Sequence, residues 1–446
     1  MVSPEFVWDT IGGMAEIAPF RGVVYDPARA GPLDRLLAPP YDVVSPAERD
    51  RLRAKSPHNF VRVDLPEGEG DAKYANAARE LSRWLEGGVL RRDERPALYR
   101  YHQRFSAGGS EVTRRGFVGR VRLRRYEERV VLPHERTLSG PRLDRLNLTR
   151  ATRAHLSQVF ALYSDPQRRV DAEFAGLESA APELEGRTDD GTVHRVWRLT
   201  DPGAQRRVAA ALADAKLYIA DGHHRYETML AVRDELRPLA RSPRSSIEYG
   251  SLFLTAMEDP GLVVLPTHRV VHGLHGFELD RFLPRLRERF AVEELRGGSP
   301  EQLRERLAAA GRASPAFAIL SGSRALLATL RPGQEAAVPG PAVVRRLDVA
   351  VLHGLILEEL LGIDRSAQER QTNLRYVKDL AGAFEEARRP DVQMVFLLNP
   401  TEVGQLRAVA EAGEIMPQKS TYFFPKLASG LLLNPIDPAE EVLEGS

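Results

Sequence analysis

The sequence predicts an α+β fold in which mixed or antiparallel sheets are flanked by helices. Strand-like runs occur in neighbouring pairs, and the clearest pair covers 96–105 and 111–123, around a glycine-containing turn at 106–110. Amphipathic helical stretches lie between such pairs instead of following every strand, and no internal repeat links them. This pattern favours α+β layers over a doubly wound parallel sheet.

Local signals predict the elements of the N-terminal half in order. An extended segment covers 17–26, and a short helix begins at Ser45 and Pro46, because serine is a good N-cap and proline fits the first helical position. An amphipathic helix over 71–90 ends at its glycine pair. The strand pair described above follows this helix.

The central and C-terminal elements follow the same logic. The apolar run 217–220 predicts a core strand, which an Asp-Gly turn and a helix to Leu236 follow. Apolar runs on both sides of 258–260 predict a second hairpin. The remaining predicted elements are helices at 279–290, 300–310, 347–363 and 400–414, a hairpin within 315–330 and a buried strand at 392–400.

The chain length predicts more than one domain. At 446 residues it is long enough for two or three domains of ordinary size. The charged, proline-containing stretch 234–246 is the best boundary, so we predict one domain over 14–240 and an α+β domain over 241–435.

Composition excludes several classes of protein. The net charge of +1 and the 43% hydrophobic and 28% charged fractions describe a globular protein without a bias toward nucleic acid or anionic membranes. The absence of cysteine excludes disulfides, thiolate catalysis and cysteine-ligated metals. No run of about 18 apolar residues and no signal-peptide layout occur, so a cytoplasmic protein is expected.

Common catalytic motifs do not occur in the chain. Neither a Walker loop nor a Rossmann glycine fingerprint is found, and no Gly-x-Ser-x-Gly elbow supports a serine hydrolase. The sequence also lacks a His-Glu-x-x-His zinc helix, and the adjacent His223 and His224 are poorly placed to share one ion.

The Asp221-Gly222 turn carries the strongest candidate site. His223, His224 and Arg225 follow it at the start of a helix, where backbone N–H groups lack helical partners and anions bind. In the functional interpretation Gly222 lets the backbone approach phosphate, Arg225 grips two phosphate oxygens, and Asp221 holds Mg²⁺ or accepts a proton. The alternative is a capped turn with solvent-facing histidines, and spacing alone does not separate the two.

A second polar segment begins at His134. His134, Glu135 and Arg136 lie in a loop after a predicted strand, and loops held by strands are where reactive groups concentrate. Glu135 is a candidate acid/base or metal ligand, and His134 and Arg136 are candidate phosphate contacts. The charge-rich residues from Leu143 onward partly fit a solvated helix instead. His268 is interpreted as an edge-strand residue.

Lysine is scarce, because arginine supplies almost all of the positive charge. Only six lysines occur, and two of them, Lys419 and Lys426, lie close together in "MPQKSTYFFPK". Lysine presents a compact point charge, so Lys419 is a candidate phosphate contact. Solvated lysines beside a strand are the alternative.

Taken together, these segments resemble the bacterial and archaeal family called domain of unknown function 1015. The segments that carry the likeness are, in order, "APPYDVVS", "HERT" followed by Asp144-Arg145, "YIADGHHRYET", "PTHRVV" and "MPQKSTYFFPKLASGL". The likeness runs from about Ile17 to about Leu433 and leaves residues 1–13 outside, so Met14 is a candidate natural start. The family name states no activity.

The strand, turn and helix over 217–236 are also similar to the phosphate-binding element of the ParB and sulfiredoxin fold. That group includes nucleotide-hydrolysing partition proteins, sulfiredoxin and kinases of free serine. The resemblance implies a ParB/sulfiredoxin-like phosphate-binding domain over 14–240, in which Gly222 to Arg225 contact phosphate and Asp221 lies beside the transferred group. The catalytic cysteine of sulfiredoxin has no counterpart here, and no helix-turn-helix supports DNA binding.

The leading prediction is a nucleotide-dependent phosphotransferase that acts on a small hydroxylated metabolite, with free L-serine preferred. ATP or ADP would be the phosphoryl donor, Mg²⁺ would bind through Asp221, Arg225 and His223 would stabilise the transferred group, and Glu135 would take the hydroxyl proton. A phosphatase or nucleotide hydrolase and a non-catalytic sensor of a phosphorylated metabolite are the alternatives. The sequence favours no nucleic-acid or membrane partner and does not fix the oligomeric state.

Overall fold

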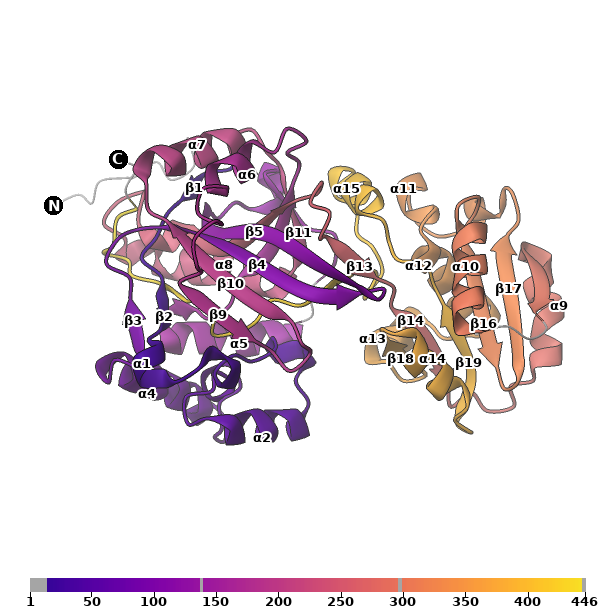
Figure 1. Cartoon of the computed structure of the whole chain (residues 1–446). Helices are drawn as coiled ribbons and strands as arrows, with labels where there is room; N and C mark the ends of the chain where they lie inside the picture. The colour runs from indigo at the N-terminus through magenta and orange to yellow at the C-terminus, as the bar shows by residue number, and fades with distance from the viewer. Residues whose placement is uncertain (1–13, 137–138, 296–298, 443–446) are drawn as a thin grey trace. The chain divides into compact units, whose positions relative to one another are not determined.

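The computed structural model describes residues 14–136, 139–295 and 299–442, and these residues form two compact units. The first unit contains described residues of 14–133, 139–263 and 425–442, and the second contains 134–136 and 264–424 (Figure 1). The chain therefore leaves the first unit after residue 263 and returns to it at residue 425. The predicted boundary near residue 240 falls too early.

A mixed nine-stranded sheet forms the centre of the first unit, as far as the chain is described. Its strand order is β6-β11-β8-β12-β5-β4-β10-β9, and β1 pairs with β5. Two pairs, β6 with β11 and β8 with β12, are parallel, and the remaining pairs are antiparallel. The strands are β1 (Ile17–Ala18), β4 (Leu98–Ala107), β5 (Ser110–Arg122), β6 (Val131–Leu132), β8 (Val159–Tyr163), β9 (Leu184–Arg187), β10 (Val193–Leu199), β11 (Leu217–Asp221) and β12 (Tyr249–Ala256).

Local sequence explains the longest hairpin of this sheet. Strands β4 and β5 are joined by Gly108 and Gly109, whose φ angles are 59° and 82°. A two-residue turn that needs two positive φ angles matches the twist of the flanking strands, and glycine adopts it without strain. The predicted hairpin is therefore confirmed.

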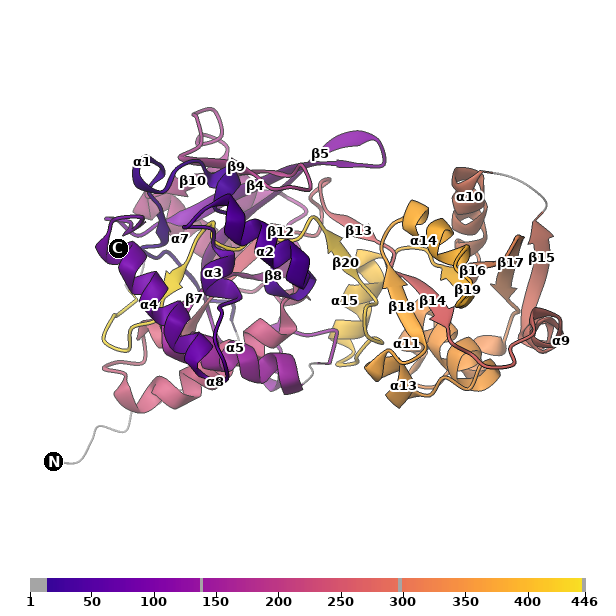
Figure 2. The same ribbon diagram turned by 90° about the horizontal axis from the view of Figure 1, so that it is seen from below.

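Helices surround the sheet of the first unit. They are α1 (Pro27–Ala30), α2 (Pro46–Lys55), α3 (Val61–Asp64), α4 (Ala72–Glu86), α5 (Ser139–Thr152), α6 (Arg169–Phe174), α7 (Pro202–Leu212) and α8 (His223–Leu236). Ser45 caps α2 as predicted, since its hydroxyl accepts a hydrogen bond from the Glu48 N–H at 3.2 Å. Helix α5 packs against α4 and α8 (Figure 2). The apolar faces of α6, α7 and α8 cover a core of strand residues.

The second predicted hairpin, around 258–260, is wrong. Its first half is β12, which pairs with β5 and β8 inside the first sheet. Its second half contains β14 (His268–His272), which pairs with strands of the second unit. Two adjacent apolar runs satisfy the same sequence pattern whether or not they pair with each other, so the pattern does not identify the partner strand.

An antiparallel six-stranded sheet forms the second unit, within the part of the chain that is described. Its order is β15-β17-β16-β19-β14-β18. The other strands are β15 (Phe290–Leu295), β16 (Ala316–Ser321), β17 (Arg324–Leu330), β18 (Leu374–Val377) and β19 (Val392–Leu397). The helices are α9 (Leu279–Arg289), α10 (Pro300–Gly311), α11 (Ala342–Arg345), α12 (Asp348–Val351), α13 (Arg365–Arg370), α14 (Leu380–Ala387) and α15 (Val403–Glu411).

The predicted apolar helix over 347–363 is present with one difference. It begins as α12 and continues as a π-helix over Leu352–Leu360, most of whose apolar side chains are buried. The predicted hairpin within 315–330 is confirmed as β16 and β17.

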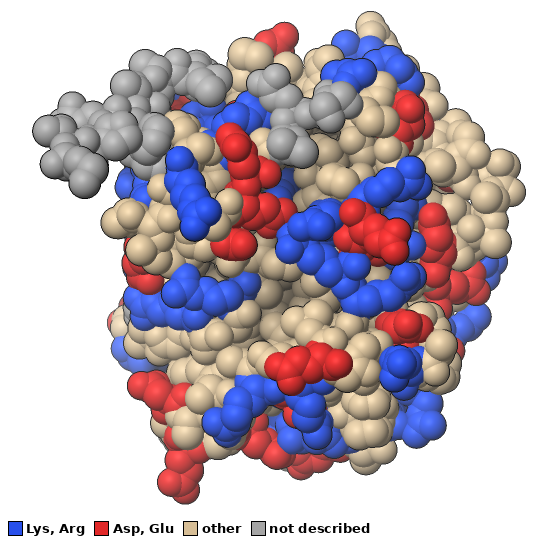
Figure 3. Space-filling view, turned by 90° about the vertical axis from the view of Figure 1, so that its left-hand side faces the viewer, with Lys and Arg blue, Asp and Glu red and all other residues tan. Residues whose placement is uncertain are grey.

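Lysine and arginine side chains are interspersed with acidic ones on the face drawn in Figure 3. In the described part of the chain, every helix is too short or too polar to span a lipid bilayer.

Candidate phosphate-binding site

The candidate site of the first unit lies where β11 ends and α8 begins. Gly222 joins them with a φ angle of 93°, a left-handed conformation that favours glycine. Space also restricts this position, because a Cβ atom at Gly222 would lie 2.8 Å from Nε of Arg225. The first helical hydrogen bond then forms from the Tyr226 N–H to the Gly222 carbonyl at 3.0 Å. The predicted strand, turn and helix are thus present at the predicted residues.

Two cations hold the carboxylate of Asp221. Nη2 of Arg225 donates to Oδ2 at 2.5 Å, and Nζ of Lys426 donates to Oδ1. Arg225 also donates from Nη1 to the Gln158 carbonyl. The side chains of Asp221 and Lys426 are 18% and 14% exposed, so this pair remains in contact with solvent.

The electrostatics of this group favour the ionised carboxylate. Burial alone would raise the pKa of Asp221, but Lys426 and Arg225 outweigh burial and hold that pKa well below its usual range. His223 lowers the pKa of Asp221 further. Asp221 is therefore a stable anion that orients two basic side chains at the start of α8.

Buried side chains of the β4–β5 hairpin fix the backbone that carries Lys426. Gln103 Nε2 donates to the Lys426 carbonyl at 2.9 Å, and Arg114 Nη2 donates to the Pro425 carbonyl at 2.6 Å. The guanidinium of Arg114 lies 4.7 Å from the centre of the Phe160 ring. Burial lowers the pKa of Arg114 to about 10, so this group is cationic at neutral pH. The hairpin thereby places the returning chain beside α8.

A second ion cluster lies in the same unit, beside a small cavity that Arg225 also lines. Arg145 donates from Nη1 to Asp64 at 2.8 Å, and Ser429 donates to the other oxygen of Asp64 at 3.0 Å. The Arg145 guanidinium lies 4.1 Å from the centre of the Tyr41 ring. A cavity of about 30 Å³, room for about one water molecule, is lined by Asp64, Arg145 and Arg225 among others.

Tyr41 titrates above its normal range in this surrounding. Burial raises the pKa of Tyr41 to about 12, although Arg225 and Arg145 oppose the change. Tyr41, Arg145 and Ser429 come from the "APPYDVVS", "HERT…Asp144-Arg145" and "FFPKLASGL" segments. Three segments that are far apart in the sequence therefore meet near α8.

The two histidines of the turn differ in exposure. His223 is buried and His224 is half-buried, so the alternative of two solvent-facing histidines does not describe this turn. The first turn of α8 contains His223, His224 and Arg225 and no acidic residue. Gly222 has no side chain that could cap the helix. Neither the N-cap residue nor the first turn of α8 therefore supplies a negative group that would offset the partial positive charge of this terminus.

The remaining predicted site residues belong to the second unit. His134 is held through its carbonyl by the Met416 N–H at 2.9 Å and through Nε2 by the Thr421 hydroxyl at 3.0 Å. Glu135 is half-buried and Arg136 is exposed. Lys419 is exposed and has a positive φ angle of 56°. The structure therefore assigns His134 to Arg136 and Lys419 to one unit and the Asp221–Arg225 turn to the other.

Arg269 forms hydrogen bonds to the backbone of the segment that contains Lys419. It is fully buried and donates from Nη2 to the carbonyls of Gln418 and Lys419 at 3.3 and 3.1 Å. Burial lowers the pKa of Arg269 to about 10. The predicted edge-strand position of His268 is wrong, because β14 lies between β19 and β18; Nδ1 of His268 accepts from the Leu398 N–H at 3.2 Å.

The carboxylate of Asp221 does not fit the predicted role of Mg²⁺ ligand. Each of its oxygens already accepts from a cationic side chain. Across the described residues, no group of three or more histidine, aspartate or glutamate side chains is arranged to hold a metal ion. The basic residues around Asp221 suit an anion instead.

The prediction missed Lys426 as a member of this site and selected Lys419. Both lysines belong to the same short segment, and only Lys426 is in the first unit with Asp221. The scarcity of lysine made both residues candidates. Lys426 pairs with Asp221, which lies 205 positions away, and no local sequence signal shows that Lys426 and not Lys419 makes this contact.

Comparison with known proteins identifies the family. The model of the family described as protein of unknown function (DUF1015) matches residues 17–350. The chain belongs to this family. No curated protein matches it.

Several solved structures are similar to the chain at low identity. A free serine kinase variant in complex with AMP is 13% identical and has a TM-score of 0.33, and the match covers 66% of this chain and 84% of that chain. A conserved hypothetical protein from Pyrococcus furiosus is 14% identical with a TM-score of 0.33, covering 67% and 90%. SbnI with a C-terminal truncation from Staphylococcus aureus is 10% identical with a TM-score of 0.32, covering 67% and 82%.

Proposed function

We propose that the first unit binds the phosphate groups of a nucleotide at the N-terminus of α8, and that the protein is a nucleotide-dependent phosphotransferase. Its acceptor would be a small hydroxylated metabolite, with free L-serine preferred. ATP or ADP would supply the phosphoryl group. Phosphoryl transfer depends mainly on positioning and on neutralisation of charge, which a cluster of basic side chains provides.

The observation that carries this proposal is the pair of basic side chains that meet at Asp221 beside the start of α8. Lys426 and Arg225 both pair with the carboxylate of Asp221, so two positively charged side chains meet where β11 ends and α8 begins. The N-terminus of α8 adds about half a charge of the same sign. Two basic side chains beside a helix N-terminus support anion binding, because a phosphate group would receive charge-assisted hydrogen bonds from them.

The proposed roles follow from this geometry. Lys426 and His224, which both retain exposure, would contact phosphate oxygens directly. Arg225 and His223 would add positive charge from buried positions, and Asp221 would act as a positioning residue. In the transfer itself the bond from the phosphorus to the leaving nucleotide oxygen breaks and a bond to the acceptor oxygen forms. Glu135 is proposed to accept the proton of the acceptor hydroxyl.

Binding of ADP tests the phosphate site. In titration calorimetry we expect Lys426→Met to weaken ADP binding roughly tenfold or more, since a hydrogen bond to a charged group contributes about 1.5–3 kcal/mol. Lys216→Met is the matched control, because Lys216 is exposed at the residue before β11. Equal loss in both variants, or unchanged affinity in Lys426→Met, would contradict the proposal. Lys419→Met tests the other predicted phosphate contact separately.

Turnover assays separate the kinase from its two alternatives. Transfer of phosphate from ATP or ADP to L-serine, lost in Glu135→Gln while ADP binding persists, is the expected result. Release of inorganic phosphate without any acceptor would identify a hydrolase. Tight ligand binding without turnover, unaffected by Glu135→Gln, would identify a sensor.

A further inference from the structure

The second unit contains a cavity that the proposed phosphate site does not use. Its volume is about 300 Å³, which is within the range of small-molecule sites. The wall is built by the start of α12, the loop that follows β19, the start of α15 and the end of α10. All of its lining residues belong to the second unit.

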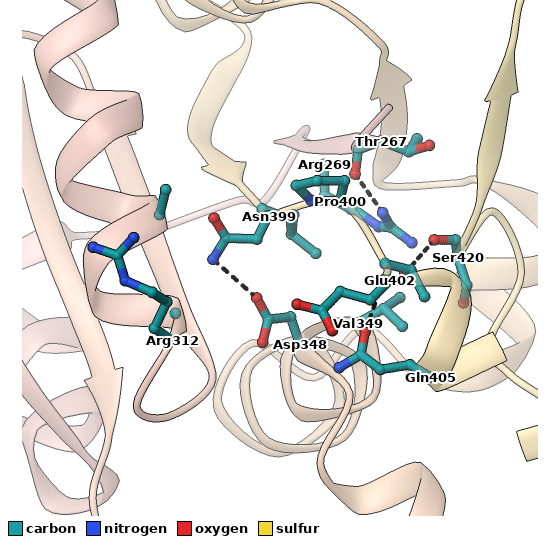
Figure 4. Close-up of a pocket in the computed structure, with 14 residues that line it drawn as sticks. Thr267, Arg269, Arg312, Asp348, Val349, Asn399, Pro400, Glu402, Gln405 and Ser420 are labelled. Atoms are coloured by element: carbon teal, nitrogen blue, oxygen red, sulfur yellow. Dashed lines mark hydrogen bonds between the residues drawn. The ribbon is translucent and has the colours of Figure 1, made fainter. Parts of the chain in front are cut away.

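Two carboxylates line this cavity. Figure 4 shows Asp348 and Glu402 directed toward the same space, with Asn399 beside Asp348. Nδ2 of Asn399 donates to Oδ2 of Asp348 at 3.3 Å. Gly311 leaves room for that amide, since a Cβ atom there would lie 2.2 Å from Nδ2 of Asn399. The carboxylates are therefore held in place by the fold.

Neither carboxylate is neutralised within the described part of the chain. No ion pair joins Asp348 or Glu402 to a described lysine, arginine or histidine, and Glu402 instead caps α15 together with Gln405. Burial raises the pKa of Asp348 to about 7, and the negative charge of Glu402 adds to the increase although Asn399 opposes it. Asp348 is partly buried and Glu402 is exposed at the same cavity, so a cation that enters it would stabilise both carboxylates.

The cavity offers few oxygen ligands to a metal ion. Two carboxylates line it, so a divalent metal would need amide, backbone or water oxygens for its remaining ligands. A primary ammonium group carries three donors and forms charge-assisted hydrogen bonds with carboxylates. The cavity has room for several heavy atoms beyond the ammonium group itself.

We propose that this cavity binds a small molecule that carries a primary ammonium group, held between Asp348 and Glu402. The site is independent of nucleotide binding at α8, since it is built from different residues of a different unit. Two arginines, the buried Arg269 and the exposed Arg312, line the same cavity, and Arg312 makes no ion pair with a described residue. Their positive charges disfavour ligands with several cationic groups.

Titration calorimetry of the full chain with three probes tests the proposal at about pH 8. We expect ethanolamine and L-serine to bind, and glycolate, which has no ammonium group, to give no binding heat. Asp348→Asn and Glu402→Gln should each weaken ethanolamine binding by about tenfold or more. Glu369→Gln is the matched control, because Glu369 lines a different cavity of the same unit, and it should leave binding unchanged.

Several results would overturn the proposal. They are binding of glycolate as tight as that of ethanolamine, no binding of either amine, or amine binding that both cavity variants retain. Binding of Mg²⁺ that displaces ethanolamine and is lost in Asp348→Asn would identify a metal site instead. Unfolding of each variant by urea verifies that it is folded, and ADP titration of the same samples reports the first unit separately.

Discussion

Asp221 and Asp348 are the same residue type in two units, and they differ in the charges of the side chains around them. Asp221 faces two cations, Arg225 and Lys426, whereas Asp348 faces an amide and a second carboxylate. Burial raises the pKa in both places, but the cations reverse that effect at Asp221. The neighbours, and not the residue type, therefore decide whether a partly buried aspartate is a fixed anion or a group that titrates near neutral pH.

The difference between the two aspartates has opposite consequences for stability. A depressed pKa means that Asp221 stabilises the fold at neutral pH and that this contribution is lost on acidification. A raised pKa means that Asp348 destabilises the fold least when it is protonated. This destabilisation grows as the pH rises toward and through about 7.

Removing Lys426 should give the largest effect. Breaking a buried ion pair costs about 3–5 kcal/mol, and we expect Lys426→Met to lie near the lower end because both side chains keep some exposure. Urea unfolding at about pH 7 measures the change. Lys216→Met should change the free energy of unfolding by less than about 0.5 kcal/mol. A loss in Lys426→Met no larger than in this control would mean that Arg225 alone holds Asp221.

Replacing Asp348 should change how stability depends on pH. The ordinary pKa is 3.8 and the folded one is about 7, so the contribution of Asp348 to the free energy of unfolding is greatest below about pH 4 and declines as the pH rises through about 7. We expect Asp348→Asn to be more stable than the natural protein at about pH 8 by on the order of 2–4 kcal/mol, and similar at about pH 4. Urea unfolding at these two pH values measures both. An unchanged pH dependence would show that Asp348 titrates in its normal range.

Neutralising Glu402 should reduce the difference in pKa between Asp348 and Asp221 while Asp348 itself is kept. Glu402→Gln removes the neighbouring negative charge and keeps an oxygen that can accept from the Gln405 N–H at the start of α15. We expect the pKa of Asp348 to fall by about one unit or less, equivalent to about 1.4 kcal/mol at most. NMR titration of the Asp348 carboxyl carbon measures it. A rise in that pKa would contradict the inferred repulsion.

An exposed ion pair between α5 and α8 gives the smallest predicted effect. Glu235 accepts from Nε of Arg150 at 2.9 Å, with both side chains more than 40% exposed. Exposed pairs contribute about 0.2–1 kcal/mol, so Glu235→Gln should destabilise the fold by no more than about 1 kcal/mol. Urea unfolding at low and high salt should show this difference shrinking with salt. A loss comparable with that of Lys426→Met would mean that burial is not what separates the two pairs.

The success of sequence-based prediction varied with the range of the interaction. The Asp221-Gly222 turn, the Ser45 cap and the hairpin at Gly108 were predicted correctly, because each depends on conformational preferences within a few residues. The hairpin around 258–260 was wrong because two apolar runs carry no information about which strand each one pairs with. The domain boundary was predicted from a charged, proline-containing stretch, whereas the chain stays in the first unit up to residue 263.

The sequence by itself determined the strand, the turn and the basic first turn of α8, since backbone geometry and helix-end electrostatics are local properties. Only the tertiary structure decided that Lys426 and not Lys419 shares a unit with Asp221, and that Asp221 is held by two cations. It also decided that Asp348 and Glu402 meet in one cavity. These outcomes depend on desolvation and on charges brought together from distant positions, which no local pattern records.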